Sequence, residues 1–471
     1  MAKLRRGFTI TLVALKYFVF YRVTSLRRER LGQRLRLACE QLGPIFVKLG
    51  QISATRYDIL EKEDCEALHG LLDNVKPVPF EEIIPLLESD FGQSYRQLYR
   101  EFSETPIASA SLSQVYKATT WEGQTVAVKI KRPEITRTIK SDIAALKSWA
   151  RIAQIFSADL RHIRIARILD QLESWTFAET DFRQEVKNLA ILSSFYKKRA
   201  AQGDNSASIL VFPKAYEKLC SDNVITLEFM EGIPATQFRA KTAGPGYDAL
   251  ASLSTALVSH TKAYLDRRDF VFHADPHPAN VLILKDGQVG LLDFGIIGIF
   301  TQYESEQLSD LILAVYRQEL NDTVRHLLAL SPGSSAADTP ALRRDLQAFL
   351  DQSPSAGFGF WLMEPVRILI KNRVPFPYKM MLFARSSLIM DGLFETVVPG
   401  QTTLEVVGPA LRAALYRQAL QNILAADFSL VLYTISEQLK QSPRALTGLV
   451  QHYFNHPLEF VQIIKEALQT T

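Results

Sequence analysis

The sequence predicts an α+β protein, with helical regions at both ends of the chain. Runs of β-forming residues occur at 125–130, at 224–232 and in the pair 281–284 and 289–292. Most of the remaining chain carries apolar residues at helical spacing. With 471 residues, of which 47% are hydrophobic, the chain can bury a sizeable core, and its length suggests two or three domains.

The clearest chemical signal lies in residues 273–280, His-Ala-Asp-Pro-His-Pro-Ala-Asn, and in the Asp-Phe-Gly that begins at Asp293. Between them, two apolar runs and a central Lys-Asp-Gly turn predict a β-hairpin. Protein kinases present a catalytic-loop Asp, an Asn five residues later and a metal-binding Asp in this order. Phosphoryl transfer needs metals held against the phosphates and an acceptor oxygen aimed in line. Asp275, Asn280 and Asp293 are therefore candidates for this chemistry.

Two other interpretations of the loop stay open. His273, Asp275 and His277 alternate and could ligate a transition metal, although this leaves Asn280 and the Asp-Phe-Gly unexplained. Alternatively, Asp275 and Asn280 only cap turns. The second alternative loses weight once the upstream partners of a kinase site are counted.

The predicted strand at residues 125–130 contains Val-Ala-Val-Lys, which matches the kinase strand whose Lys binds the α- and β-phosphates. That residue is Lys129. A loop of small residues precedes the strand where kinases carry their Gly-rich loop, and it consists of Ala108, Ser109, Ala110 and Ser111. Without glycine the loop lacks easy access to positive φ and the closest backbone approach, so a nucleotide would be cradled differently. A turn of small residues with no ligand is the alternative.

A carboxylate partner for Lys129 is expected on an apparent helix over residues 177–188. Glu185 is the candidate, and Asp181 lies one turn earlier on the same face of that helix. More than 50 residues separate Lys129 from Glu185, including a helical stretch at 141–155, so the first lobe carries an insertion. Further on, residues 224–232 are expected to be a strand that leaves into a linker, where the backbone groups of Glu228 and Met230 are candidates to contact adenine.

Residues 31–57 follow the helical period, with a break expected at Gly43 and Pro44. The second part contains Lys48-Leu-Gly-Gln. Lys48 and Gln51 are three residues apart and share a helix face. Taken alone, this tetrapeptide is more often part of a solvated helix face than of a site.

Taken together, these motifs resemble those of the UbiB/ADCK family of atypical, protein-kinase-like proteins. The resemblance spans about residues 40–300, in the family's order. It rests on the K-x-G-Q tetrapeptide, the alanine-rich loop, the Val-Ala-Val-Lys strand, Glu179-Thr-Asp181 with Glu185, and the two later motifs. One departure is Ala279, where the family commonly has Gly, so that the loop backbone is slightly less free.

The resemblance implies a two-lobed protein-kinase-like fold that binds ATP and Mg²⁺ and serves ubiquinone or other prenyl-quinone synthesis. It implies that Lys129 and Glu185 form the nucleotide ion pair, that Asn280 and Asp293 hold metal, and that Asp275 orients or deprotonates an acceptor. It further implies that the helix of Lys48 and Gln51 covers the active site opposite Glu179 and Asp181. Restricted access would favour ATP hydrolysis or a small lipid acceptor over protein substrates. The alternative is a nucleotide-gated scaffold or lipid chaperone for other quinone enzymes.

The two ends of the chain suggest contact with a membrane. No acidic residue precedes Glu29, and residues 8–21 are largely apolar and aromatic but too short to span a bilayer. Such a segment can lie in a membrane interface rich in anionic lipids; an ordinary first helix or a transit peptide are the alternatives. The apolar stretches near 420–435 and 446–464 are interrupted by charges and are also not expected to span.

We therefore expect five parts: an interfacial segment (1–30), a helical extension (31–100), a kinase-like N-lobe (101–232), a C-lobe (233–400) and a helical C-terminal region (401–471). The expected partners are ATP, a prenylated quinone precursor or lipid, quinone-biosynthesis enzymes and an anionic membrane surface, without nucleic acid. An odd number of cysteines, three, argues for a reducing compartment. The expected location is the cytoplasm at the inner membrane, with an organellar matrix as the alternative.

Overall fold

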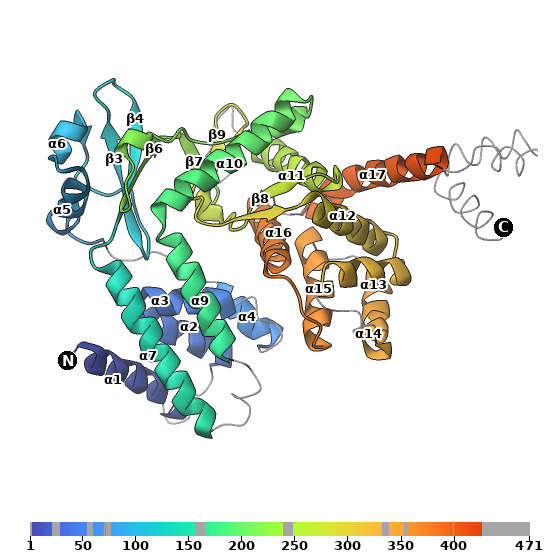
Figure 1. Ribbon diagram of the computed structural model, residues 1–471, viewed down its shortest axis with the longest axis horizontal. Coiled ribbons are helices and arrows are strands. Elements are labelled where there is room, and N and C mark those ends of the chain that lie inside the picture. The colour runs from blue at the N-terminus through green and yellow to red at the C-terminus, as the bar shows by residue number, and fades with distance from the viewer. Residues whose placement is uncertain are drawn as a thin grey trace, which may run out of the picture.

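The predicted two-lobed α+β fold is confirmed by the computed structural model, shown in Figure 1. The structure describes residues 2–20, 29–53, 60–69, 71, 77–156, 165–238, 248–331, 339–352, 357–398 and 400–425. One lobe is organised around a single sheet. The other is mainly helical and holds two smaller sheets.

The sheet of the first lobe is antiparallel, with strand order β1-β3-β4-β6 and β2 paired to β3. Its strands are β1 (Glu101–Phe102), β2 (Ala108–Ser109), β3 (Ser113–Thr119), β4 (Thr125–Lys131) and β6 (Val224–Glu228). On β4, Val126, Val128 and Ile130 are fully buried against helices α5 (Phe80–Phe91) and α6 (Tyr95–Leu98). Because side chains alternate along a strand, Lys129 lies on the opposite face, toward the second lobe.

The predicted insertion consists of α7 (Ile135–Phe156) and α9 (Ile165–Glu179), and α10 (Phe182–Ala201) follows it. The expectation of one helix carrying Glu179, Asp181 and Glu185 was wrong. Helix α9 ends at Glu179. The Asp181 carboxylate then accepts a hydrogen bond from the Gln184 amide at 3.0 Å, which caps the start of α10. Glu179 and Glu185 therefore approach the site on two different helices, and Asp181 serves as a cap rather than as a residue of the helix face.

The N-terminal extension is helical, as predicted. Its first helices are α2 (Leu31–Leu42), α3 (Pro44–Ser53) and α4 (Lys62–His69), and α1 (Ala2–Ala14) with a π-helical turn (Leu15–Val19) precedes them. The expected break between α2 and α3 is present, and Gly43 adopts a φ of +96° there, which favours glycine. Helix α3 contacts both α7 and α9, so the extension lies beneath the first lobe in Figure 1.

Two small sheets in the second lobe support the loops that carry the predicted chemistry. Strand β8 (Phe270–His273) pairs with β11 (Ile297–Phe300), and the other sheet has the order β5-β10-β9-β7. Its strands are β5 (Leu210–Val211), β7 (Gly232–Pro234), β9 (Val281–Leu284) and β10 (Val289–Leu291). The predicted hairpin is thus formed by β9 and β10, which pair antiparallel. It connects the loop of Asp275 and Asn280 to Asp293.

Helices make up the rest of the second lobe. They are α11 (Ala249–Leu265), α12 (Gln302–Tyr316), α13 (Leu320–Ala329), α14 (Pro340–Leu350), α15 (Phe358–Lys371), α16 (Tyr378–Val397) and α17 (Thr403–Ala425). Short 3₁₀ turns lie at Asn205–Ile209, Glu217–Leu219 and Pro278–Asn280. The chain turns between α12 and α13, where Gln318 has a φ of +60°.

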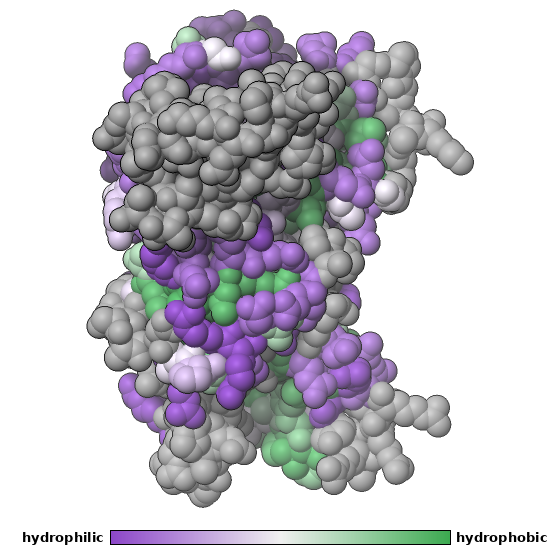
Figure 2. All heavy atoms as spheres, turned by 90° about the vertical axis from the view of Figure 1, so that its right-hand side faces the viewer, coloured by the Kyte–Doolittle hydropathy of each residue, from purple (hydrophilic) through white to green (hydrophobic). Residues whose placement is uncertain are grey.

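Most of the described residues that are visible in Figure 2 are hydrophilic. The view looks onto the right-hand side of Figure 1 and shows polar residues around a smaller hydrophobic area. In the described part of the chain, no helix combines the length and the hydrophobicity needed to cross a membrane. The apolar stretch predicted near 446–464 and most of that near 420–435 lie outside the described residues.

Candidate active site

The structure brings Lys129, Glu185 and Asp293 into direct contact, although each comes from a different element. The Lys129 ammonium lies 2.8 Å and 2.9 Å from the two carboxylate oxygens of Glu185, and 3.1 Å from Oδ2 of Asp293. Lys129 is on β4, Glu185 is on the first turn of α10, and Asp293 follows β10. One ammonium is therefore shared by two carboxylates at the junction of the two lobes.

The two carboxylates that share Lys129 differ in pKa. Burial alone would lower the pKa of Lys129, but Asp293 and Glu185 raise it above its usual value, so that the ammonium stays charged. Burial and the neighbouring Asp293 raise the pKa of Glu185 to about 7. For Asp293, burial is outweighed by Lys129 and by the Gly295 amide, which together hold its pKa at about 2. Asp293 is therefore ionised at neutral pH, the form in which a carboxylate binds metal.

His273 connects the catalytic-loop motif to the Asp-Phe-Gly motif. Its Nδ1 accepts a hydrogen bond from the Asp275 amide at 3.1 Å, and its Nε2 lies 2.6 Å from the Asp293 carbonyl oxygen. This pattern assigns the proton to Nε2. With both ring nitrogens bonded to backbone, His273 is not offered as a metal ligand, and no cluster of three His, Cys, Asp or Glu suited to a metal occurs among the described residues. The transition-metal interpretation of the loop therefore loses its first ligand.

The loop also places Asn280 beside the Asp293 segment. The Leu292 amide donates to the Asn280 carbonyl oxygen at 2.8 Å, so the residues before Asp293 are tied to the end of the 3₁₀ turn. The Gly295 amide donates to Oδ1 of Asp293 at 3.0 Å. The side chains of Asn280 and Asp293 carry an amide and a carboxylate, whose hard oxygen donors are of the kind that suits Mg²⁺.

Asp275 is paired with a residue that the sequence interpretation missed. Arg385 on α16 lies 3.3 Å from Oδ1 of Asp275, and the next residue, Ser386, donates to the His273 carbonyl oxygen at 2.8 Å. Burial would raise the pKa of Asp275, but Arg385 and then Lys48 lower it below its usual value. Helix α16 therefore fixes the catalytic loop from a position more than 100 residues later in the chain.

Lys48 of α3 forms an ion pair with Glu179, the last residue of α9, and both side chains are largely buried. Burial raises the pKa of Glu179 in spite of Lys48, and the charges of Asp275 and Asp293 add to that effect. Glu179 therefore faces the same acidic centre. Gln51 lies on α3 as predicted, but its side chain is outside the described residues.

The glycine of the K-x-G-Q tetrapeptide has a packing role. A Cβ at Gly50 would lie 2.3 Å from Leu71 Cδ1 and 3.1 Å from Cys39 Sγ, closer than atoms pack. Glycine at this position thus lets α3 pack closely on Cys39 of α2 and on Leu71, and a larger residue would displace these side chains. The same packing sets the place of Lys48, two residues earlier on α3.

The loop of small residues is held by an arginine that was not predicted. Ala108 and Ser109 form β2, and the Ala110 amide donates to the Ser113 carbonyl oxygen at 2.9 Å. Arg132 donates to the Ala110 carbonyl oxygen at 2.9 Å and to the Ser109 hydroxyl at 2.8 Å. Ser111, the fourth residue of the loop, is 5% exposed. The loop is thus a braced hairpin end, in contrast to an open glycine-rich loop.

At the predicted linker between the lobes, part of the backbone is already bonded. The Glu228 amide donates to the Lys214 carbonyl oxygen at 2.8 Å, and the Lys214 amide donates back to the Glu228 carboxylate at 3.1 Å. Met230 packs against β10, since a Cβ at Gly290 would lie 2.7 Å from its Cε. The Glu228 N–H is therefore not available to an adenine base in this conformation.

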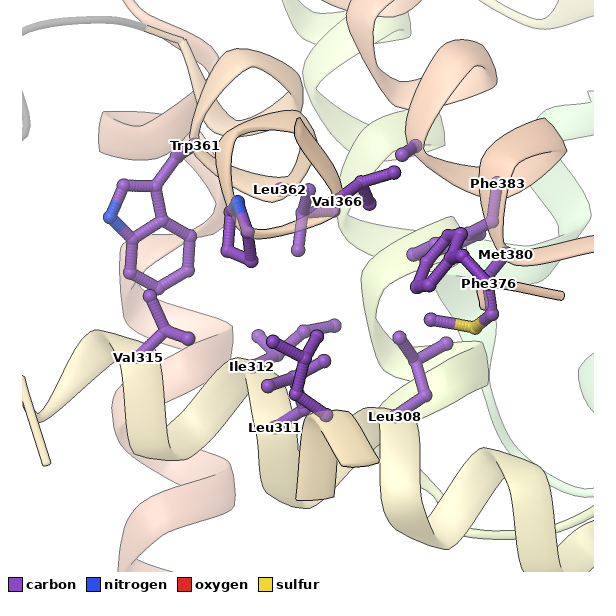
Figure 3. A pocket seen from close by; sticks show the side chains of 13 residues that line it. Leu308, Leu311, Ile312, Val315, Trp361, Leu362, Val366, Phe376, Met380 and Phe383 are labelled. Carbon is purple, nitrogen blue, oxygen red and sulfur yellow. The ribbon is translucent and has the colours of Figure 1, made fainter. Parts of the chain in front are cut away.

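A pocket elsewhere in the second lobe has a different character. Figure 3 shows it between α12, α15 and α16, lined only by apolar residues such as Leu308, Ile312, Val366 and Phe383. It contains no group that could bind phosphate or metal. The candidate active site is therefore the cluster around Lys129, Asp275 and Asp293.

The family model described as "ABC1 atypical kinase-like domain" matches residues 70–327, more than half of the chain. The "Probable protein kinase UbiB" of Xylella fastidiosa is 33% identical over 295 residues, which cover 61% of this chain and 51% of that protein.

Two further relatives match over longer stretches. The "Probable protein kinase UbiB" of Haemophilus ducreyi is 26% identical over 453 residues, covering 92% of this chain and 80% of that protein. An uncharacterized protein from the hydrogenase 1 5' region of Clostridium pasteurianum is 28% identical over 386 residues, covering 81% and 70%. The match to the Xylella protein thus spans about half of that relative's length.

Proposed function

Because the chain belongs to the UbiB/ADCK family of ABC1 atypical kinase-like proteins, which is implicated in ubiquinone biosynthesis, we propose that it binds ATP with Mg²⁺ and hydrolyses it or transfers its γ-phosphoryl group. The observation that carries the proposal is the contact of Lys129 with both Glu185 and Asp293. It joins a lysine suited to phosphate with a carboxylate suited to metal. Asp275 and Asn280 lie on the loop that the β9–β10 hairpin connects to Asp293.

The charges around the centre fit a divalent cation. Four carboxylates, Glu179, Glu185, Asp275 and Asp293, face three cations, Lys48, Lys129 and Arg385. The surplus is negative, and the Asp293 side chain is 43% exposed on the side that a ligand would approach. Asn280 and Asp293 would hold Mg²⁺, which when bound neutralises charge on the phosphates. Lys129 would bind the α- and β-phosphates, and Asp275 would orient the acceptor oxygen and receive its proton.

The acceptor is proposed to be water or a small lipid rather than a protein. Helix α3 lies against α9, and its Lys48 forms an ion pair with Glu179 at the acidic centre. A helix in this position would restrict the approach of a folded protein substrate. The proposed role is therefore Mg-ATP turnover in support of prenyl-quinone synthesis, with a prenylated precursor and the enzymes that modify it as partners.

A second candidate function uses the nucleotide as a switch. The buried Lys48–Glu179 pair ties the extension to the centre, so nucleotide binding could be coupled to the position of α3. In that case the protein would be a nucleotide-gated scaffold or lipid chaperone with little turnover. The presence of Asp275, Asn280 and Asp293 favours catalysis over a scaffold role.

Contact with an anionic membrane is proposed for the first helix. Ile10, Val13 and Tyr17 are buried against the extension. The outward face carries Phe8 (65% exposed) and Leu12 (50%), and the turn that follows adds Val19 (58%). Phe8, Leu12 and Val19 recur at helical spacing, and the segment has no acidic residue before Glu29. An apolar stripe on a basic segment suits a surface of anionic lipids.

The test of the proposed activity is phosphate release from ATP by the purified protein, with and without Mg²⁺, beside the variant Asp293→Asn. Anionic liposomes that contain a prenyl-phenol form a further arm. Release that requires Mg²⁺ and Asp293 and rises with the liposomes would support an ATPase coupled to lipid precursors. Nucleotide binding without release would favour the scaffold, and the absence of both would exclude the proposal.

The membrane proposal needs substitutions rather than removal of the segment, because Ile10, Val13 and Tyr17 belong to the core. The variant Phe8→Ser/Leu12→Ser should bind anionic liposomes more weakly in co-sedimentation. Ile107→Ser is the matched control, because it removes an apolar side chain of the first lobe that is 51% exposed. Equal binding by both variants would place the membrane contact elsewhere.

A further inference from the structure

Asn188 lies on α10, three residues after Glu185, and has no part in the proposed chemistry. It is 5% exposed, and its side-chain amide donates to the Phe294 carbonyl oxygen at 2.8 Å and to the Gly295 carbonyl oxygen at 3.3 Å. Its own oxygen accepts from Gln184 Nε2 at 2.9 Å. The donors of one buried side chain are thus directed at the two residues that follow Asp293.

Asp293 needs such support because its backbone is in an uncommon conformation. Its φ is +58°, in the left-handed region that residues with a Cβ rarely adopt. Such conformations persist where the surroundings fix them, and they gather at functional sites. Around Asp293, the Phe294 amide lies 3.4 Å from the Glu185 carboxylate, and the Asp293 carbonyl oxygen is held by His273. Asn188 binds the remaining two carbonyl oxygens of the motif.

We infer that Asn188 is a positioning residue, which holds the Phe294–Gly295 backbone so that the Asp293 carboxylate is oriented for a divalent cation. This inference rests on the proposed function, since it assigns a role in the same metal site. Glu185 and Asn188 share one face of α10. A displacement of α10 would therefore release the Lys129 pair and the support of Asp293 together.

The inference differs from a purely structural role in what it predicts about metal. A buried amide that only satisfies two carbonyl groups would, when removed, lower the stability of the fold. A positioning residue would in addition weaken the effect of Mg²⁺ on nucleotide binding, while metal-free binding through Lys129 is retained. The test therefore measures the effect of Mg²⁺ on nucleotide binding separately from the stability of the fold.

The experiment measures the affinity of the full-length protein for a fluorescent ATP analogue, first without metal and then across a Mg²⁺ titration. Asn188→Leu keeps the side-chain size and removes both hydrogen-bond donors. We expect its half-saturating Mg²⁺ concentration to rise by about tenfold, the change that corresponds to losing one or two hydrogen bonds. The metal-free affinity should change by less than about twofold, well within the effect of a single lost hydrogen bond.

Asn372→Leu is the matched control. The Asn372 side chain donates to the Asp345 carboxylate and to the Ile368 carbonyl oxygen, both at 2.9 Å, within the second lobe and outside the site. It should lower the melting temperature without changing the Mg²⁺ titration. If Asn188→Leu behaves like Asn372→Leu, the role of Asn188 is structural and the inference is overturned.

Gln184→Ala covers the case in which Asn188→Leu does not fold. Gln184 is exposed, and its loss removes the bond that orients the Asn188 amide. A smaller rise of the half-saturating Mg²⁺ concentration is expected, and an unchanged titration would overturn the inference. If the unmodified protein shows no Mg²⁺ effect on nucleotide binding, the proposed function itself fails, which is a separate outcome.

Discussion

Lys48 of α3 and Glu179 at the end of α9 form an ion pair that joins the N-terminal extension to the centre of the candidate site. The two side chains are 10% and 16% exposed, so both charges have lost most of their hydration. Burial raises the pKa of Glu179 although Lys48 opposes the change. The extension is therefore attached to α9 through a buried ion pair, in which each charge is stabilised by the other.

The first prediction concerns stability. Lys48→Met leaves Glu179 buried without its partner and should lower the free energy of unfolding by about 3 kcal/mol, the usual cost of breaking a buried pair. The double variant Lys48→Met/Glu179→Gln removes both charges and should recover most of that loss. Denaturant unfolding of the two single variants and the double variant measures the coupling. Additive losses would show that the two side chains do not stabilise each other.

The second prediction concerns nucleotide. Lys48→Ala removes a cation that is bound to the acidic centre and loosens the contact of α3 with α9, so nucleotide affinity or autophosphorylation should increase. Titration with Mg-ATP and a phosphate-transfer assay measure both quantities. Arg36→Ala, which breaks an exposed pair with Glu40 on α2, is the control from the same extension. Unchanged affinity and activity would remove the idea that α3 acts as a lid.

The sequence predicted the elements whose signals are local. The β9–β10 hairpin and the break before α3 follow from a Lys-Asp-Gly turn and a Gly-Pro pair. It did not predict the break between α9 and α10, because helical spacing continues across it. That break is made by the Asp181 cap, whose effect depends on a backbone bond to Gln184. Local sequence patterns thus predicted the helices and strands better than the breaks between consecutive helices.

The same division holds in the site. Lys129, Glu185 and Asp293 were predicted because each lies in a motif, and the structure places them in contact. Arg385 and Arg132 were missed, since the first reaches Asp275 from a distant helix and the second braces the small-residue loop from the end of a strand. Neither has a spacing that marks it. Residues that hold the motifs in place are visible only in three dimensions.

The third prediction concerns Arg385, which lowers the pKa of Asp275. In Arg385→Met this influence is lost, so the pKa of Asp275 rises and the acidic limb of the kcat/KM profile should move to higher pH. Arg385→Lys keeps the charge and should move the limb less. Rates of Mg-dependent phosphate release between acidic and neutral pH give the profile. A lower rate with an unmoved limb would mean that Arg385 acts only on structure.

The fourth prediction concerns His260 on α11, whose ring packs against Tyr264, Phe270 and Phe383. Burial, together with the nearby Arg199, lowers its pKa from the model-peptide value of 6.5 to about 4. Between these values the unfolded chain takes up a proton that the folded protein does not. The free energy of unfolding should therefore fall as the pH drops below about 6.5.

The size of this effect follows from the difference in pKa. Between about pH 7.5 and about pH 5, His260 should account for a loss on the order of 2 kcal/mol. His260→Phe keeps an aromatic ring in the cluster and cannot titrate, so its unfolding free energy should fall less over the same range. The variant also loses a contact with the Tyr196 hydroxyl, but this changes stability equally at both pH values. If the two proteins lose the same free energy on acidification, other groups are responsible for it, and His260 is protonated as readily in the folded protein as in the unfolded chain.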